Sequence, residues 1–364
     1  MKERFTFETR EQAEDEARQI EETFRRSQIT HPSRDQYETA SRQETALDKR
    51  AEVEAHGRPE RIRVLEERAE RLFPGKELAW LRDEIRTSFD VPQFGPYHNE
   101  GNFMDTHLAL IFERLDEARD GKFDASVPEE IRPLITRVVR EERDFFEKYV
   151  FLHDLRKKDC LTVTYLDGEK VSGSWKDWKA SLPPEAQHDP RALRAHSKQS
   201  GIRSISYFQD RGRGRGGFVQ HGEDATRYLE MRGVPLPKGM RIAIREHEVA
   251  YQFSSVHADT YRRHFQNLTA RERELAIVAT YLDSASSLSK DGGIEAQIKG
   301  VKALLDSKYN YELLTDIHAV LGRRPDVNQV LLDRELARLE KAKERIREPK
   351  EEVVRRLAEE CRTR

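Results

Sequence analysis

The chain has 364 residues, of which 65 are Lys or Arg and 67 are Asp or Glu, so its formal net charge is −2. This balance excludes a nucleic-acid binder that is held by bulk positive charge alone. The two cysteines form no CxxC pair, and no apolar run reaches the roughly 18 residues of a membrane-spanning helix, so we expect a cytoplasmic protein without a cysteine-based zinc site or a membrane partner.

Residues 1–75 form a polar N-terminal extension that we expect to be helical and solvated. The spacing of polar and apolar residues predicts helices over 9–26, 34–55 and 60–73, with a break at the Gly and Pro of 56–59. The third helix carries an apolar stripe at three- and four-residue steps, made of Ile62, Leu65, Ala69 and Leu72. This stripe favours packing on the rest of the chain, and an oligomerisation arm is the alternative.

Residues 76–290 are richer in apolar side chains and are predicted to form the main domain. Helices are expected over 76–89, 103–119, 127–155, 221–232, 239–254, 258–267 and 270–288. The β-branched run 160–165, the Asp-Gly turn at 167–168 and the run 170–175 predict a β-hairpin. The segment 181–218 is rich in Pro, Ser, Gly and Arg and predicts a long loop insertion. The predicted fold class is therefore all-α with one small β-hairpin.

Residues 291–364 are predicted to form a C-terminal helical region. Helices are expected over 293–304, 309–320 and 325–361, and Pro349 should kink or break the last of them. Together with the N-terminal extension, these terminal helices offer surfaces through which a homo-oligomer would form.

Histidine and aspartate occur in the main domain at apolar positions, where a polar or charged side chain needs a partner. His107 lies beside the apolar stripe of its helix, His153 and Asp154 are adjacent at the end of an apolar helix, and Asp283 interrupts another apolar run. A divalent cation compensates buried imidazole and carboxylate groups together, and these donors suit Zn, Fe, Mn or similar ions.

This order of residues resembles the HD-domain superfamily of metal-dependent phosphohydrolases, and most of all the HD domain attached to bacterial CCA-adding tRNA nucleotidyltransferases. The matching elements over about residues 90–290 are Gln93, His98-Asn99-Glu100-Gly101, His107, Leu152-His153-Asp154-Leu155-Arg156-Lys157, His221, His247 and Asp283. Arg156 stands where family members often have Gly, and Gly222 separates His221 from Glu223, where members have His-Glu. No nucleotidyltransferase domain is apparent before these elements, so a CCA-adding activity is not implied.

The resemblance implies an HD-type helical bundle that holds one or two divalent metal ions (Mn, Fe, Ni, Co, Mg or Zn). The implied ligands of the first ion are His107, His153, Asp154 and Asp283. The implied ligands of the second ion are His221 and His247, with Asp154 as the bridge between the two ions. For this pair of histidines, whose neighbours are polar, a surface position is the alternative. The His-x-Glu-Gly element implies that His98 and Glu100 lie at the substrate.

Such a site hydrolyses a phosphomonoester or phosphodiester with metal-activated water. Asp154 would act as ligand and orienting group. Lys157, three residues further on, would reach a phosphate oxygen, unless it is an ordinary solvated lysine at a helix end. The expected substrate is a nucleotide or an RNA end, and cyclic 2′,3′-phosphate ends are one candidate that the resemblance implies.

A run of alternating arginine and glycine precedes His221. Its forked donors, which suit phosphate, are Arg211, Arg213 and Arg215. The flanking aromatic side chains that offer stacking surfaces for a base are Tyr207, Phe208 and Phe218. The run predicts a clamp for substrate phosphate or RNA, and a solvated loop is the alternative.

Two other functions stay open at this point. Some relatives with the same ligand set hold two irons and use dioxygen to cleave C–P or C–C bonds. The chain would alternatively be a non-catalytic helical scaffold or nucleic-acid-binding protein with a vestigial HD site. The presence of all the candidate ligands argues against a vestigial site.

Overall fold

The computed structural model describes residues 34–93, 103–210, 218–248, 265, 267–288, 294–340 and 345–362. The chain divides into two units, residues 1–47 and residues 48–364. Every side-chain contact discussed below lies within the second unit. Helices dominate the described residues, and the strands form one small antiparallel sheet and one separate strand pair, which confirms a mainly helical fold class.

The first described element, α2 (Arg34–Leu72), is one continuous helix. The expected break at 56–59 is therefore wrong, although Pro59 removes one backbone hydrogen bond. Arg58 and Arg61 lie on either side of this proline, and both form ion pairs with Asp105. These contacts hold the helix together across the proline. The predicted apolar stripe packs on the main core as expected, with Leu65, Ala69 and Leu72 buried and Ile62 half-buried.

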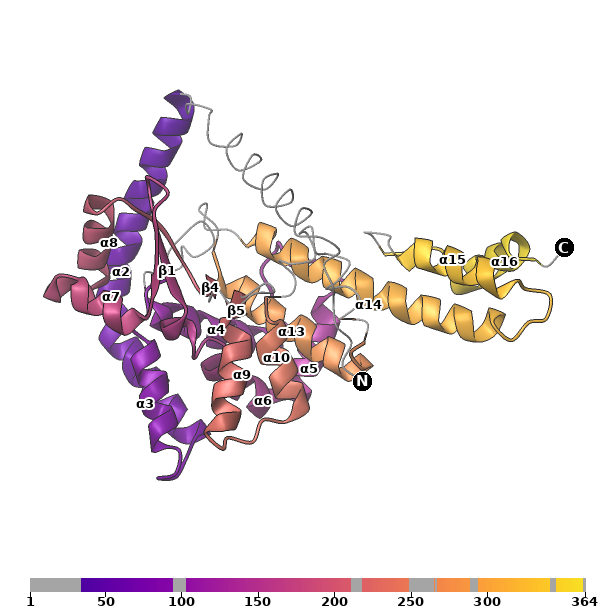
Figure 1. Ribbon diagram of the computed structural model, residues 1–364, viewed down its shortest axis with the longest axis horizontal. Coiled ribbons are helices and arrows are strands. Elements are labelled where there is room, and N and C mark those ends of the chain that lie inside the picture. Colours follow the sequence, from indigo (N-terminus) through magenta and orange to yellow (C-terminus); the bar gives the residue numbers. More distant parts are fainter. Residues whose placement is uncertain are drawn as a thin grey trace. The chain divides into compact units, whose positions relative to one another are not determined.

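Residues of 175–205 and 294–305 contribute to the main hydrophobic core in the described part of the chain, but most of it comes from α2 and seven further helices (Figure 1). These seven are α3 (Ala79–Ser88), α4 (Met104–Arg119), α5 (Arg132–Glu141), α6 (Arg143–Leu152), α9 (His221–Met231), α10 (Lys238–Glu246) and α13 (Ala270–Ser286). The single helix expected over 127–155 is wrong, because the backbone leaves the helical region at Glu142 (φ −122°, ψ 40°) and starts α6 in a new direction. Both apolar faces, one on each helix, are thereby buried.

The helix α13 lies at the centre of this core and contacts α4, α5, α10 and α14 (Glu295–Leu321). Its N-terminus is closed by a capping box, in which the Thr269 hydroxyl accepts from the backbone N–H of Glu272 and the Glu272 carboxylate accepts from that of Thr269. Every residue from Leu275 to Ser286 is buried, which explains why the segment is apolar on all sides. A carboxylate at Asp283 is therefore placed deep in the protein.

The predicted β-hairpin is present, and it belongs to a larger sheet than expected. Strand β1 (Leu161–Tyr165) pairs with β2 (Lys170–Gly173) on one side and with β3 (Ile202–Ser206) on the other, both antiparallel. The strand β3 comes from the segment 181–218, so the predicted loop insertion is wrong. That segment also contains η2 (Pro184–Gln187), α8 (Pro190–Gln199) and β4 (Phe208–Asp210), and it follows α7 (Trp175–Ser181).

The strand β4 pairs antiparallel with β5 (Phe218–Gln220), and α9 begins directly after β5. The register pairs Asp210 with Phe218, so the arginine-glycine run joins these two strands. The run itself lies outside the described residues, as do the helix expected over 9–26 and most of the one expected over 258–267.

The C-terminal region packs around a hydrophobic cluster of its own. Its helices are α14 (Glu295–Leu321), α15 (Gln329–Glu340) and α16 (Lys350–Glu360). Leu321, Leu332 and Leu357 belong to this second cluster. The predicted break at Pro349 is confirmed, because Pro349 precedes the first residue of α16, whereas the two helices expected over 293–320 are one continuous helix. The domain boundaries at residues 75 and 290 stay predictions.

Within the residues that the structure describes, no helix is both long enough and apolar enough to cross a membrane.

Candidate metal centre

Six buried side chains that the sequence singled out meet at one place. His107 comes from α4, Asp283 from α13, and His153 and Asp154 from the residues directly after α6. His221 is the first residue of α9 and His247 follows the last residue of α10. All six are buried, so the alternative of a surface position for the last two histidines is wrong.

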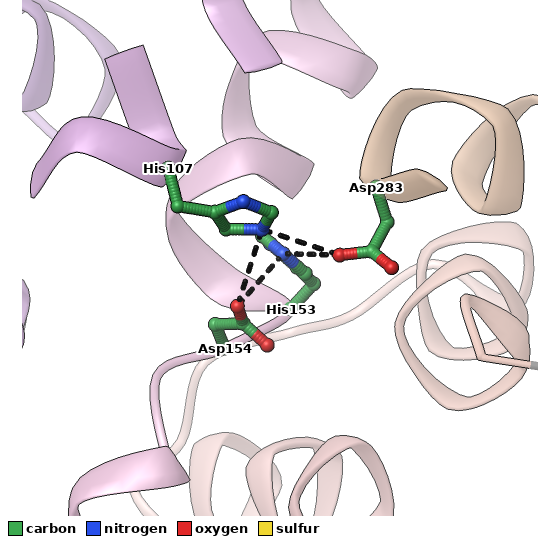
Figure 2. A group of neighbouring side chains, drawn as sticks. All are labelled: His107, His153, Asp154 and Asp283. Carbon is green, nitrogen blue, oxygen red and sulfur yellow. Dashed lines mark hydrogen bonds and ion pairs between the residues drawn. The ribbon is translucent and has the colours of Figure 1, made fainter. Parts of the chain in front are cut away.

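The first group consists of His107, His153, Asp154 and Asp283. Figure 2 shows the two imidazole rings directed at the two carboxylates. His107 Nε2 lies 3.2 Å from Asp283 Oδ1 and 3.7 Å from Asp154 Oδ2. His153 Nε2 lies 3.2 Å from Asp154 Oδ2 and 3.9 Å from Asp283 Oδ1. Donors bound to one ion at about 2.1 Å lie roughly 3.0–3.5 Å from one another. Two of these separations are in that range and the other two are slightly longer, so small side-chain shifts would let the group bind a common ion.

The second group consists of Asp154, His221 and His247. His221 Nε2 lies 3.1 Å from both Asp154 Oδ1 and His247 Nε2, and His247 Nε2 lies 3.8 Å from Asp154 Oδ1. Asp154 therefore turns one carboxylate oxygen to each group. This is the arrangement of a carboxylate that bridges two cations.

Backbone carbonyls fix the orientation of three of the imidazole rings. Nδ1 of His153 donates to the carbonyl of Val150 at 3.0 Å, and Nδ1 of His247 donates to that of Ile244 at 2.6 Å. Nδ1 of His221 donates to the carbonyl of Tyr207 at 3.3 Å. Because a carbonyl only accepts, the proton of each neutral ring lies on Nδ1 and the lone pair lies on Nε2. Metal-bound histidines are typically held by such contacts.

The contact between His221 and His247 requires a proton or a cation between the two rings. Both rings present Nε2 lone pairs when they are neutral, and two lone pairs 3.1 Å apart repel unless a proton or a cation lies between them. Burial lowers the pKa of His247 to about 4, so this ring is neutral at pH 7. Burial also lowers the pKa of His221, but Glu248 and Asp154 outweigh it and raise that pKa, as expected beside carboxylates that attract positive charge.

The carboxylates of the site stay ionised although they are buried. Burial alone would raise the pKa of Asp283, but His107, His247 and Lys157 hold it below its usual range. Burial acts in the same direction on Asp154, where His153 and Lys157 outweigh it and lower the pKa. The site thus offers carboxylate oxygen and imidazole nitrogen donors, a set that suits divalent transition ions. The residues present fit one or two such ions.

Lys157 is buried, so the alternative of a solvated lysine is wrong. Its ammonium group lies 2.7 Å from Asp154 Oδ2 and 5.2 Å from the centre of the Tyr207 ring. Burial lowers the pKa of Lys157, but Asp154, Asp283 and Glu248 outweigh it and raise the pKa, so the lysine is charged. It contributes a fixed positive charge at the edge of the first group.

Backbone and side-chain contacts lock the contributing helices against one another. The Tyr149 hydroxyl donates to the carbonyl of Ala279, which ties α6 to α13. The Thr280 hydroxyl shares its one proton between the carbonyl of Ala276 in its own helix, at 2.8 Å, and that of Glu246 at the end of α10, at 3.2 Å. A Cβ atom on Gly222 would lie 2.5 Å from the carbonyl oxygen of Ile244, so only glycine lets the start of α9 approach the end of α10. This approach brings the second pair of histidines together.

Sequence reasoning missed three residues that shape the site. Gly222, which appeared as a departure from the family pattern, permits the close approach just described. Arg156 donates to Asp224 at 3.0 Å and stacks on Tyr228, and thereby ties the turn after Asp154 to α9. Glu248 lies with its Oε1 4.0 Å from His221 Nε2. The sequence carried no signal for Glu248, because a carboxylate stands out only when it interrupts an apolar run.

The remaining candidate residues have separate outcomes. Glu223 points away from the site, is more than half exposed and pairs with Arg227. The predicted substrate contacts that lie outside the described residues are His98, Glu100, Arg211, Arg213 and Arg215. Their roles stay predictions.

Comparison with known proteins identifies no relative. No protein-family model matches the chain, no curated protein matches its sequence, and no solved structure matches its fold.

Proposed function

We propose that this protein is a metal-dependent phosphohydrolase with an HD-type helical bundle, acting on a nucleotide or on the phosphate at an RNA end. The observation that carries the proposal is the bridging geometry of Asp154, whose two oxygens face two groups of imidazole donors. Two cations that share a carboxylate are suited to an in-line displacement at phosphorus, because they contact both the attacking and the leaving oxygen.

Bound divalent ions would supply Lewis acidity toward the phosphoryl oxygens and lower the pKa of water toward neutrality. The chain's own residues prepare that chemistry. The three backbone carbonyls described above hold imidazole Nε2 atoms toward the ions. Asp154 sets the spacing between the two groups. Lys157, charged and buried beside Asp154, provides a positive charge for a phosphate oxygen that approaches the first group.

The substrate class follows from what adjoins the site. The arginine-glycine run joins β4 to β5, and β5 leads directly to His221. Forked guanidinium donors at that point would bind further phosphates of a nucleotide or an RNA end. The Tyr207 ring is buried beside Lys157, and the backbone carbonyl of Tyr207 orients His221.

Elemental analysis of the purified protein, followed by a screen of phosphate esters with Mn, Fe, Co, Ni, Mg and Zn, tests the proposal. We expect the wild-type protein to bind divalent ions and to hydrolyse a nucleotide or a cyclic 2′,3′-phosphate. Asp154→Asn, which keeps the side-chain volume, should lose both ions and the hydrolysis while the helical circular dichroism stays unchanged. His318→Ala, which removes an exposed histidine of α14, should behave as wild type.

Two outcomes would contradict the proposal. Metal binding that survives Asp154→Asn would mean that the ions bind elsewhere. Two irons per chain with substrate-dependent dioxygen uptake and no hydrolysis would assign a di-iron oxygenase that cleaves a C–P or C–C bond instead. A chain that binds no ion under any of these conditions would be a helical scaffold with a vestigial site.

A further inference from the structure

Glu248 extends the second group of donors. It follows His247 directly after α10, and its side chain is 27% exposed, whereas the side chains of the six candidate ligands are at most 6% exposed. Its Oε1 lies 4.0 Å from His221 Nε2. That nitrogen also lies 3.1 Å from Asp154 Oδ1 and 3.1 Å from His247 Nε2. The Glu248 oxygen thus lies farther from His221 Nε2 than the other two donor atoms do, and its partly exposed side chain would shift toward the group to join them.

We propose that Glu248 is the fourth protein ligand of the second cation. The inference rests on the proposed metal centre and adds a ligand that the sequence comparison did not suggest. The first group has four protein donors, two imidazoles and two carboxylates. With Glu248, the second group has the same composition, because Asp154 is shared by both. Matched donor sets favour the same class of divalent ion at the two positions.

The charge of the cluster supports this assignment. The carboxylates of Asp154, Asp283 and Glu248 contribute three negative charges, and Lys157 returns one positive charge. The three carboxylates therefore outnumber the one lysine at this place. Lys157 pairs with Asp154 Oδ2, the oxygen of the first group. The second group, where Glu248 lies, has no such direct lysine contact among the described residues.

The exposure of Glu248 gives the two positions different properties. The first group is enclosed on the side of His107 and His153, whose side chains have no exposed surface. The second group meets solvent through the Glu248 carboxylate. The second ion should therefore exchange faster and be the one that is lost first on dialysis.

Equilibrium binding of Mn²⁺, measured by calorimetry and by the electron paramagnetic resonance of the free ion, tests the assignment. We expect two ions per wild-type chain and a spin-coupled signal from the pair. Glu248→Gln should weaken one of the two sites by about 10-fold to 100-fold or more, abolish the coupled signal at limiting Mn²⁺, and leave the other site unchanged. Glu223→Gln, a matched change on the exposed side of α9, should leave both sites unchanged.

The outcomes separate this inference from the function on which it rests. Two sites of unchanged affinity in Glu248→Gln, or a single site in the wild-type chain, would overturn the role of Glu248 while the first site stands. A wild-type chain that binds no Mn²⁺ or other divalent ion would overturn the metal centre itself. Glu248→Asp, which keeps the charge but shortens the side chain, should restore part of the lost affinity. A purely structural role predicts no such rescue.

Discussion

A buried carboxylate at the start of α4 holds two arginines of α2. Asp105 has no exposed surface, and its Oδ1 accepts from Arg58 Nε at 3.1 Å while its Oδ2 accepts from Arg61 Nε at 2.7 Å. We predict that Asp105→Asn destabilises the protein, because it removes the charge that compensates two largely buried guanidinium groups.

The magnitude follows from the contacts that remain. Loss of one partner of a buried ion pair costs about 3–5 kcal/mol. Arg58 keeps a second carboxylate, Asp90 Oδ1 at 2.7 Å, and the new Asn side chain retains one accepting oxygen. Both features place the expected loss near the lower end, at about 3 kcal/mol, which corresponds to a fall in Tm of roughly 5–10 °C. His107 lies two residues further along α4, so divalent-ion affinity should fall as well.

Thermal and urea unfolding of the purified variants measures this loss. The control is Asp83→Asn, which removes a 74% exposed carboxylate lying 3.8 Å from Arg86 and should change the stability by less than about 0.5 kcal/mol. If Asp105→Asn unfolds within about 1 kcal/mol of that control, α2 does not brace α4 through this carboxylate and the reasoning is refuted.

Two further predictions concern the site itself. Gly222→Ala should destabilise the protein by about 1–3 kcal/mol and lower its affinity for the second ion, because the added methyl group would lie 2.5 Å from the Ile244 carbonyl oxygen. The control is Gly173→Ala, where a Cβ atom meets nothing within 4 Å. Equal effects of the two substitutions in unfolding and in Mn²⁺ titration would contradict the packing argument. The metal-free protein should lose stability as the pH falls below about 4, because the folded-state pKa of Asp283 lies below its unfolded value and its contribution is present only above that value. Asp283→Asn should flatten this part of the pH profile in urea unfolding, and an unchanged slope would contradict the assignment.

The apolar pattern predicted part of the candidate site, whereas His221 and His247 have polar neighbours and were implied only by the family resemblance. His153, Asp154 and Asp283 stand in buried segments, where an uncompensated polar group is costly, and the structure brings them together. Glu248 gave no such contrast, because its neighbours in the chain are polar and only its position beside His221 marks it. Convergence in space is information that a linear pattern lacks.

The errors in the fold have a similar origin. Pro59 and Gly57 are local helix breakers, but α2 continues through them, and ion pairs to a distant part of the chain form beside them. The segment 181–218 has the composition of a loop, yet Leu193, Ile202 and Ile205 bury enough apolar surface to order a helix and a strand. In both places, tertiary contacts override local preference.

The ligands of the first group lie far apart in the chain, since His107 and Asp283 are 176 positions apart. An ion held between them would act as a reversible cross-link that closes a long stretch of the chain into a loop, as a disulfide bond does. At a free-ion concentration 1,000 times the dissociation constant, such a clasp would add about 4 kcal/mol to the folded state. The concentration of free metal ion would then set the stability of the folded protein as well as its activity.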